Sequence, residues 1–289
     1  MSETAAQPSA TTPDFPAGIG HADGPDEPIR YTEYDVASAL AVLRRADEGE
    51  PETLLSLTDE QIAGADGYLR RQLAALPWLH EQPDQLPFAA GVGLRTLIAA
   101  GQVAPVTVEG SDEVVWTAVP ELDGCLVLRR TADLFASVER TVQGAHGRQV
   151  HRLYYYVHEE GVLEEEVAAS GIHHFTPLRR EQVPARMLTL IDQDQVVSDS
   201  GDPVTVRASA LTAGHEFAPR IADARAVSVL TSVRTGSDEA RQVSIYASTS
   251  EVIAMEATDA ESEDPEVRLR AVDAEELQEL VCLFIGLES

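Results

Sequence analysis

Apolar residues recur at helical spacing in the first third of the chain, at i, i+3, i+4 and i+7, and predict amphipathic helices. Three such helices are predicted, over 33–47, 61–76 and 88–100. The second follows a capping-box pattern of Thr58 and Gln61, and a proline at position 77 would end it. Gly101 gives the third helix a C-terminal cap.

Beyond Gly101 the period changes to strict alternation, which predicts strands. The predicted strands are a hairpin over 103–119 and segments over 138–142, 150–157, 227–233, 243–245, 251–257 and 267–269. Helical spacing returns over 180–192 and 273–285, the second helix behind a capping box of Asp273 and Glu276. The pattern leaves 193–225 open between a short strand and short helices.

An internal repeat, offset by about 93 residues, runs through the strand-rich part of the chain. The first copy contains Arg140, Arg148-Gln-Val150, Val162, Phe175, Glu181 and Val183. The second contains Arg234, Arg241-Gln-Val243, Val252, Leu269, Glu275 and Leu277. We therefore predict an α+β fold, in which a helical N-terminal region precedes two pseudo-two-fold-related halves of antiparallel sheet plus helices.

Composition divides the chain into three parts. Residues 1–30 are small, polar or proline and cannot bury enough surface to offset their ordering entropy, so we predict a disordered tail. An N-terminal α+β half follows over 31–192, with helices first and then the hairpin and strands. A C-terminal α+β half covers 193–289.

The charge balance excludes several classes of function. The chain has 289 residues, of which 49 are acidic and 21 basic, so its net charge is −28. It contains no lysine, which rules out a Walker-type phosphate loop and Schiff-base chemistry, and no asparagine. The use of arginine for every basic residue indicates a GC-rich, actinobacterial genome. Such acidity opposes contacts with nucleic acid and with anionic membranes.

We also expect a cytoplasmic protein. The start of the chain lacks the basic and apolar regions of a signal peptide, and no segment approaches the roughly 20 apolar residues that span a bilayer. Cys125 and Cys282 each lie in an apolar stretch, so we predict two buried thiols in a reducing compartment.

Candidate chemistry is sparse. His151 and His158 are seven residues apart on a strand and point to opposite faces, so we predict solvated histidines, as for the pair at 173–174. The run Glu164–Glu166 is interpreted as an exposed edge. Alternation in Tyr154–Tyr156 predicts a buried Tyr155 and two exposed neighbours that could contact a partner.

No catalytic, cofactor-binding or metal-binding residue is assigned. Asp192 and Asp194 lack the glycine and terminal glutamate of a calcium loop, and nucleophile-elbow, dinucleotide and Cys-x-x-Cys motifs are missing from the sequence. We therefore predict that the chain is no enzyme and needs no cofactor. Its partner-binding residues stay unassigned at this stage.

Two alternatives come from the same elements. The three helices and the 103–119 hairpin could form a winged helix of a transcriptional regulator, but its recognition helix offers only Arg95 and its wing tip, 109–113, is acidic. The chain could also be a structural homodimer without a ligand, joined through a sheet edge.

Several junctions resemble a known family. The capped helix that leads to Leu76-Pro77-Trp78, the segment Gly93-Leu94 through Gly101-Gln102-Val103, and two strand-rich halves that each close in a helix resemble the actinobacterial EspG family. The resemblance covers about 54–289. No binding residue can be carried over, because no family motif matches position by position.

The resemblance implies a function. EspG proteins are cytosolic chaperones of type VII (ESX) secretion that hold a helical substrate by its hydrophobic tip, in a groove between the sheet and the C-terminal helices. It implies that this chain binds a small helical secreted protein, with a sheet face or the helices over 180–192 and 274–285 forming the groove.

Overall fold

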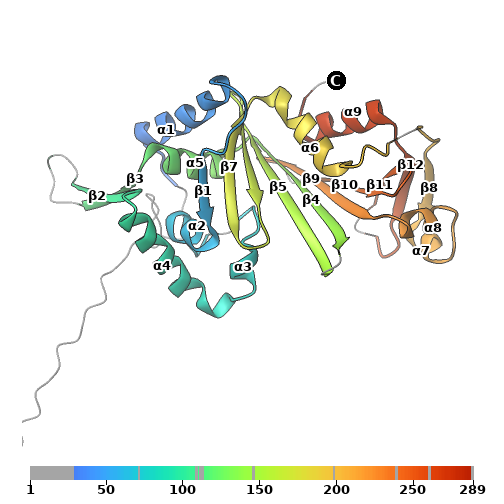
Figure 1. The fold of residues 1–289 in the computed structure, drawn as a ribbon, viewed down its shortest axis with the longest axis horizontal. Coiled ribbons are helices and arrows are strands. Elements are labelled where there is room, and N and C mark those ends of the chain that lie inside the picture. Colours follow the sequence, from blue (N-terminus) through green and yellow to red (C-terminus); the bar gives the residue numbers. More distant parts are fainter. Residues whose placement is uncertain are drawn as a thin grey trace, which may run out of the picture.

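The computed structural model describes residues 29–70, 72–107, 110, 114–144, 147–197, 199–237, 240–259 and 262–287 (Figure 1). All but the last two residues of the predicted tail therefore lie outside the described residues. The helices are α1 (Glu33–Arg44), α2 (Asp59–Asp66), α3 (Pro77–His80), α4 (Leu86–Ala99), α5 (Pro120–Thr131), α6 (Val183–Ile191), α7 (Ala208–Thr212), α8 (Phe217–Ala222) and α9 (Ala274–Phe284). Short 3-10 turns cover Arg45–Asp47, Pro83–Gln85 and Arg180–Gln182.

The strands form one large and one small antiparallel sheet. They are β1 (Leu55–Thr58), β2 (Val103–Thr107), β3 (Val114–Ala118), β4 (Leu134–Gly144), β5 (Gly147–Val157), β6 (Val162–Val167), β7 (Ile172–Leu178), β8 (Val204–Arg207), β9 (Ala226–Arg234), β10 (Ala240–Ala247), β11 (Val252–Ala257) and β12 (Glu266–Ala271). The large sheet has the order β1-β7-β6-β5-β4-β9-β10-β11-β12-β8, and β2 and β3 form the predicted hairpin.

The large sheet has a pseudo-two-fold axis at its centre. β4 pairs with β9, and the pair Val138–Leu230 lies in the middle of their register, between Leu134–Arg234 and Val142–Ala226. Outward from this pair, β4-β5-β6-β7-β1 repeats as β9-β10-β11-β12-β8. Helix α6 follows β7, α9 follows β12, and the two helices pack together (Figure 1). The predicted α+β fold with two related halves is confirmed.

One part of the predicted repeat is out of register. Val138 and Leu230 occupy equivalent places, and their partners are Leu153 on β5 and Val243 on β10. The equivalent of Val243 is therefore Leu153, not the Val150 that the shared Arg-Gln-Val letters indicated. Backbone pairing fixes the correspondence, whereas three shared letters on exposed strand ends do not.

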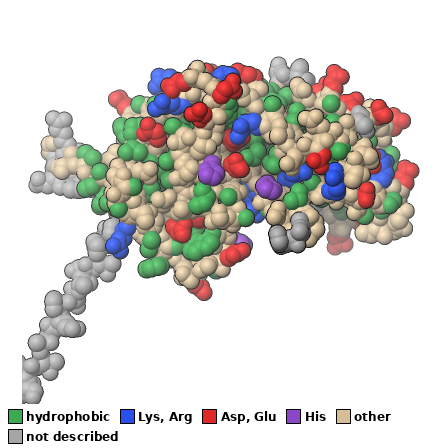
Figure 2. Space-filling model, viewed as in Figure 1, with side chains coloured by type: hydrophobic (Ala, Val, Ile, Leu, Met, Phe, Trp, Pro, Cys, Tyr) green, Lys and Arg blue, Asp and Glu red, His purple; other side chains and the backbone are tan. Residues whose placement is uncertain are grey.

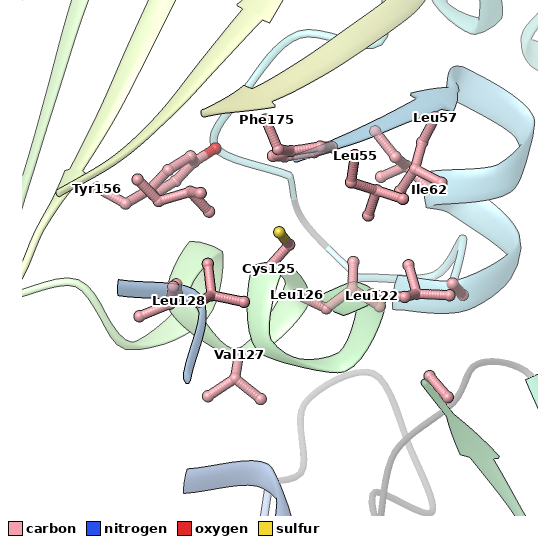
Figure 3. Close-up of a cluster of buried hydrophobic side chains, with 14 of the residues drawn as sticks. Leu55, Leu57, Ile62, Leu122, Cys125, Leu126, Val127, Leu128, Tyr156 and Phe175 are labelled. Atoms are coloured by element: carbon pink, nitrogen blue, oxygen red, sulfur yellow. The ribbon is translucent and has the colours of Figure 1, made fainter. Parts of the chain in front are cut away.

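Helices cover both faces of the sheet. On one face, α6 and α9 enclose a core that spans both halves. Its largest contributors are Tyr155, Leu178, Met187, Ile191, Leu230, Leu277 and Phe284. On the other face, α1, α2 and α5 cover the first half, and α7 and α8 cover the second. In the first half, Cys125 of α5 points toward Phe175 of β7, beside Tyr156 and Leu55 (Figure 3).

The predicted helix over 61–76 is wrong at its end. Helix α2 starts at the predicted capping box, in which Thr58 Oγ1 accepts from the Gln61 backbone, but it stops at Asp66. Gly67, at φ +93°, turns the chain out of the helical region, where a side chain would be strained. Leu69 and Leu73 are consequently exposed, and the proline at 77 begins α3 instead of ending a helix.

Several elements were not predicted, among them α3, β6 and β7, and one open region is now defined. Helix α5 was missed although it carries Pro120 at its first position, acidic residues in its first turn and arginines in its last. The four-residue strand β1, which ends at the capping-box residue Thr58, was also missed. The open segment 193–225 contains both alternatives, since β8 is followed by α7 and α8. No helix of the described part is long and apolar enough to cross a membrane.

Candidate functional site

A layer of charged side chains is buried between the sheet and the helices of the first half. His173 on β7 lies between two carboxylates: its Nε2 is 2.7 Å from Asp59 Oδ1 and its Nδ1 is 2.6 Å from Glu165 Oε1. All three side chains are fully buried. Asp59 Oδ2 also accepts the backbone N–H groups of Trp78 and Leu79, at 2.8 and 3.0 Å. The ring therefore ties α2, α3, β6 and β7 together.

Arginines from α5 complete this polar core. Arg129 donates from Nε to Glu165 Oε2 (2.9 Å) and from Nη1 to Asp66 Oδ2 (3.2 Å), and Arg130 also pairs with Asp66. The Tyr156 hydroxyl donates to Glu165 Oε2 at 2.6 Å. With His173 protonated, three cationic side chains balance three carboxylates, so the buried charges are paired throughout.

The pKa values follow from these contacts. Burial alone would raise the pKa of Glu165, but Arg129, His173 and Tyr156 outweigh it and lower the pKa to about 2. Burial would lower the pKa of His173, but its hydrogen bonds to Asp59 and Glu165 raise it overall. The cluster stabilises the charged forms of Glu165 and His173, which are buried from solvent. This arrangement holds the layers together, and Asp66, Arg129, Arg130 and Tyr156 at its margin line a small surface pocket of about 290 Å³.

Several sequence predictions are corrected here. Glu164 and Glu165 are buried, so the predicted exposed edge is wrong except for Glu166. Tyr154, Tyr155 and Tyr156 are all buried, because helices cover both faces of β5. His158 is buried with Nε2 at 3.1 Å from the Leu128 carbonyl, and His173 is fully buried, so of the four histidines predicted to be solvated two, His151 and His174, are exposed or half-buried.

The remaining predicted positions lie apart from one another. Cys125 is buried as predicted, and burial raises the pKa of its thiol, while Cys282 is half-buried. Asp192 accepts the backbone N–H groups of Val196 and Val197 at 2.9 and 3.0 Å, which is a turn contact. In the described part of the chain, no three His, Cys, Asp or Glu side chains form a group that could hold a metal.

The winged-helix arrangement is not formed. The hairpin β2–β3 follows α4 as predicted, and α4 packs on α2. Helix α1, however, packs mainly on α5 and lies above it on the far side from α4 (Figure 1). The three predicted helices therefore do not build one trihelical unit that could present α4 to DNA.

Two surface grooves are better candidates for binding. The first, which we call the α6 groove, encloses about 960 Å³. It runs from Pro77 and Glu81 across the ends of β5 and β6 to α6. Its wall includes Arg140, Arg148, Gln149, Val150, His151, Arg152, Leu153, Glu166, Val167, Ala168, Ala169, Ala185, Arg186, Thr189, Leu190 and Gln193. Arginine and histidine side chains are visible near the middle of the face in Figure 2.

The second, the α9 groove, encloses about 670 Å³ beside the C-terminal helix. It is lined by Arg241, Val243, Glu256, Arg270, Glu276, Glu279, Leu280, Leu283, Phe284 and Leu287. Leu283 is 54% exposed, and Leu280 and Leu287 are half-buried on either side of it. Leu280 and Leu283 lie about one turn apart on α9, and Leu287 follows Gly286, at φ +68°, beyond the helix end, so the groove has an apolar wall open to solvent.

The two grooves are equivalent under the pseudo-two-fold axis. Val157 and Ala247 end β5 and β10 and pair with the first residues of the following strands. Equivalent strand residues are found by counting back along β5 and β10 from Val157 and Ala247. Equivalent helix residues are found from the number of residues between β7 and α6 and between β12 and α9. Equivalent lining pairs are His151/Arg241, Leu153/Val243, Glu166/Glu256, Arg186/Leu280, Thr189/Leu283 and Leu190/Phe284. The helix wall thus contains Arg186 in the α6 groove and Leu280 in the α9 groove, whereas the strand walls of both grooves contain charged residues.

Comparisons with known proteins were made at the level of sequence and of structure. No protein-family model matches the chain, and no curated protein matches its sequence. Among solved structures, the chain is similar to the type VII secretion system chaperone EspG5 of Mycobacterium tuberculosis, solved in complex with a PE25–PPE41 dimer. The identity is 10% and the TM-score 0.41, over 67% of this chain and 82% of the other. The comparison thus returns a member of the family that the sequence resembles, and we transfer no residue role or partner from it.

Proposed function

We propose that this chain is a non-enzymatic binding protein, a cytosolic chaperone or adaptor that holds a helical secretion substrate in the α9 groove. The observation that carries the proposal is the apolar wall of Leu280, Leu283 and Leu287, open to solvent beside the sheet. Soluble proteins rarely leave a hydrophobic strip in a groove unless another surface covers it.

The shape of the wall favours a helix as the occupant. Leu280 and Leu283, about one turn apart on α9, form a short ridge that Leu287 extends beyond the helix end, and the apolar face of a second helix can pack against it. Glu256 and Glu279 also line this groove, and neither has an arginine partner among the described ion pairs. Basic residues beside the apolar face of the partner would complement these carboxylates and set selectivity.

The buried polar core supports the non-enzymatic part of the proposal. Two of its titratable groups, Glu165 and His173, are hydrogen-bonded to each other and are buried from solvent. A general acid or base must reach the proton that it transfers. The link to secretion and to the cytosol is supported by the resemblance of the sequence junctions to the EspG family.

The experiment compares two matched variants. Leu283→Glu places a charge on the apolar wall, and Thr189→Glu places the same charge at the equivalent position of α6; both residues are exposed. Tagged full-length protein and both variants are purified from the native host, and the bound proteins are identified by mass spectrometry. We expect a small helical secreted protein with the unmodified chain and with Thr189→Glu, and its loss with Leu283→Glu.

Two outcomes contradict this proposal. One is an identical set of bound proteins for Leu283→Glu and the unmodified chain, which would place binding elsewhere. The other is a homodimer in light scattering that Leu283→Glu dissociates, because a second copy of the chain would then occupy the groove. Circular dichroism of both variants checks that neither loss of binding reflects unfolding.

A further inference from the structure

β5 has a free edge within the α6 groove. β4 and β5 pair along their whole lengths, out to Gly144 and Gly147. On the other side of β5, β6 pairs with Arg152–Val157 alone. The last pair is Arg152–Val167, and the chain leaves the sheet after Val167. Residues 147–151 therefore have a strand on one side and, among the described residues, no strand on the other. These five residues are exposed or half-buried.

Cations lie on both faces of this edge. His151 pairs with Arg140 across β4 and β5, so these two side chains share the face toward α6. Arg148 and Arg152 alternate onto the opposite face, toward α3. In a chain of net charge −28, four of the 21 basic residues line this one groove.

Neither Arg140 nor Arg148 forms an ion pair within 4 Å among the described residues, although Asp192 and Asp194 act on Arg140 from farther away. Arg140 is only 8% exposed; its Nη1 donates to Gln193 Oε1 at 2.7 Å, and its buried Nε has no hydrogen-bond partner in the described part of the chain. Arg148 reaches only the Thr141 hydroxyl, at 3.4 Å. Arg186, by contrast, is already paired with Glu164. A buried donor without a partner is costly and is met by a ligand in many sites.

We propose that this edge binds an extended acidic segment of a partner protein, which adds to the sheet as a strand beside Gly147–His151. Backbone hydrogen bonds to β5 would supply affinity, and carboxylates of the segment would pair with Arg140 and Arg148. The negative charge elsewhere on the chain is screened beyond about 8 Å at physiological ionic strength, so the groove's own charges, four arginines against Glu81 and Glu166, govern the contact.

The occupant is assigned to a partner rather than to the chain's own first residues. Residues 1–28 are acidic, with prolines at 8, 13, 16, 25 and 28. Proline has no N–H to donate to a strand edge and is avoided in paired strands. The inference concerns the α6 groove and goes beyond the function proposed for the α9 groove, so that either can fail alone.

The test uses a fluorescein-labelled seven-residue peptide of alternating valine and glutamate. Cations lie on both faces of the edge, so either register brings the carboxylates to arginine. Fluorescence anisotropy with the full chain measures the Kd. We expect saturable binding that Arg148→Gln weakens about tenfold and Arg140→Gln/Arg148→Gln weakens further. Arg241→Gln, which removes one exposed arginine from the equivalent strand β10, should leave the Kd unchanged.

A second peptide separates strand addition from simple anion binding. N-methylation of every residue keeps every carboxylate but removes the backbone donors from both edges of the peptide, and it should abolish binding. The proposal is overturned if the valine–glutamate peptide does not bind below about 1 mM. It is also overturned if Arg148→Gln and Arg241→Gln have equal effects, or if the N-methylated peptide binds equally well.

Discussion

The two halves share a backbone plan but bury different chemistry at the same places. In the first half, Val167 pairs with His173 and Glu165 with Phe175; in the second, Ala257 pairs with Val267 and Met255 with Leu269. Glu165 and His173 thus stand where the second half has Met255 and Val267. Strand pairing depends on backbone groups, so the fold tolerates either an ionic or an apolar layer at these positions.

The same contrast recurs on the surface. Equivalent helices place Arg186 and Thr189 in the α6 groove but Leu280 and Leu283 in the α9 groove. The second half therefore has an apolar layer inside and leucines on the helix wall of its groove, whereas the first half has an ionic layer inside and Arg186 on that helix wall. We interpret the two grooves as binding surfaces that occupy equivalent positions in the two halves but differ in the side chains that line them.

The largest effect is expected from breaking the ionic layer. Arg129→Met leaves Glu165 buried without its arginine and takes one of two arginines from Asp66, so the free energy of unfolding should fall by about 3–5 kcal/mol. Met255→Leu, a volume-conserving change in the equivalent layer, should cost less than about 1.5 kcal/mol. Urea unfolding of both variants measures the difference. Equal costs would show that the ionic layer has no special part in the fold.

The next effect is a dependence on pH. The raised pKa of His173 gives stability that is complete below its unfolded value of 6.5 and is lost as pH rises through the folded pKa. The lowered pKa of Glu165 gives stability present above 4.5 and lost as pH falls toward about 2. Urea midpoints should therefore be highest between these unfolded values and decline on either side.

Histidine variants isolate the first of these groups. His173→Gln should remove the decline of the urea midpoint above about pH 6.5, because no imidazolium is then lost. His151→Gln changes an exposed histidine in the α6 groove and should leave the decline in place. A decline that persists unchanged in His173→Gln would assign it to another group.

A smaller effect concerns the helix that carries the α9 groove. Asp273 Oδ1 accepts the Glu276 backbone N–H at 2.9 Å, so Asp273→Ala should destabilise the protein by about 1 kcal/mol. Glu275→Ala in the same turn removes only an exposed carboxylate and serves as the control. Thermal unfolding distinguishes them, and equal shifts would mean that the capping box contributes nothing.

The smallest effect is expected at the groove wall. Leu283→Ala and Thr189→Ala should each change the free energy of unfolding by no more than about 0.5 kcal/mol, because both side chains are exposed. A loss of about 2 kcal/mol for Leu283→Ala in urea unfolding would show that Leu283 belongs to the core and is not kept open for a partner.

Much of the fold could be predicted from short sequence motifs at helix ends. The capping boxes at Thr58 and Asp273 mark true helix starts, and Gly101 at φ +72° ends α4 as predicted. Helix α5 could have been found from its proline and its charge gradient. The stop after Asp66 depended on the left-handed conformation of Gly67, a choice that the apolar spacing of Leu69 and Leu73 does not reveal.

The burial of charged residues could not be predicted locally. Three consecutive glutamates resemble a solvated strand, yet Glu164 meets Arg186 and Glu165 meets Arg129 and His173, all distant in the sequence. The predicted groove-forming helices, by contrast, do border grooves, because their apolar stripes define the helix faces. The contrast between the grooves comes partly from these helices, through Arg186 and Leu280, and partly from Arg140, Arg148 and Arg152, which the strand register brings to the α6 groove.

The most direct test of the central claim is hydrogen exchange of the full chain with and without its purified helical partner. If that partner packs on the apolar wall, amide exchange should slow in α9 and in the facing end of β10, while α6 stays unchanged. Slowed exchange in α6 with none in α9, or unchanged exchange in both, would contradict the assignment of the helix-binding surface to the second half.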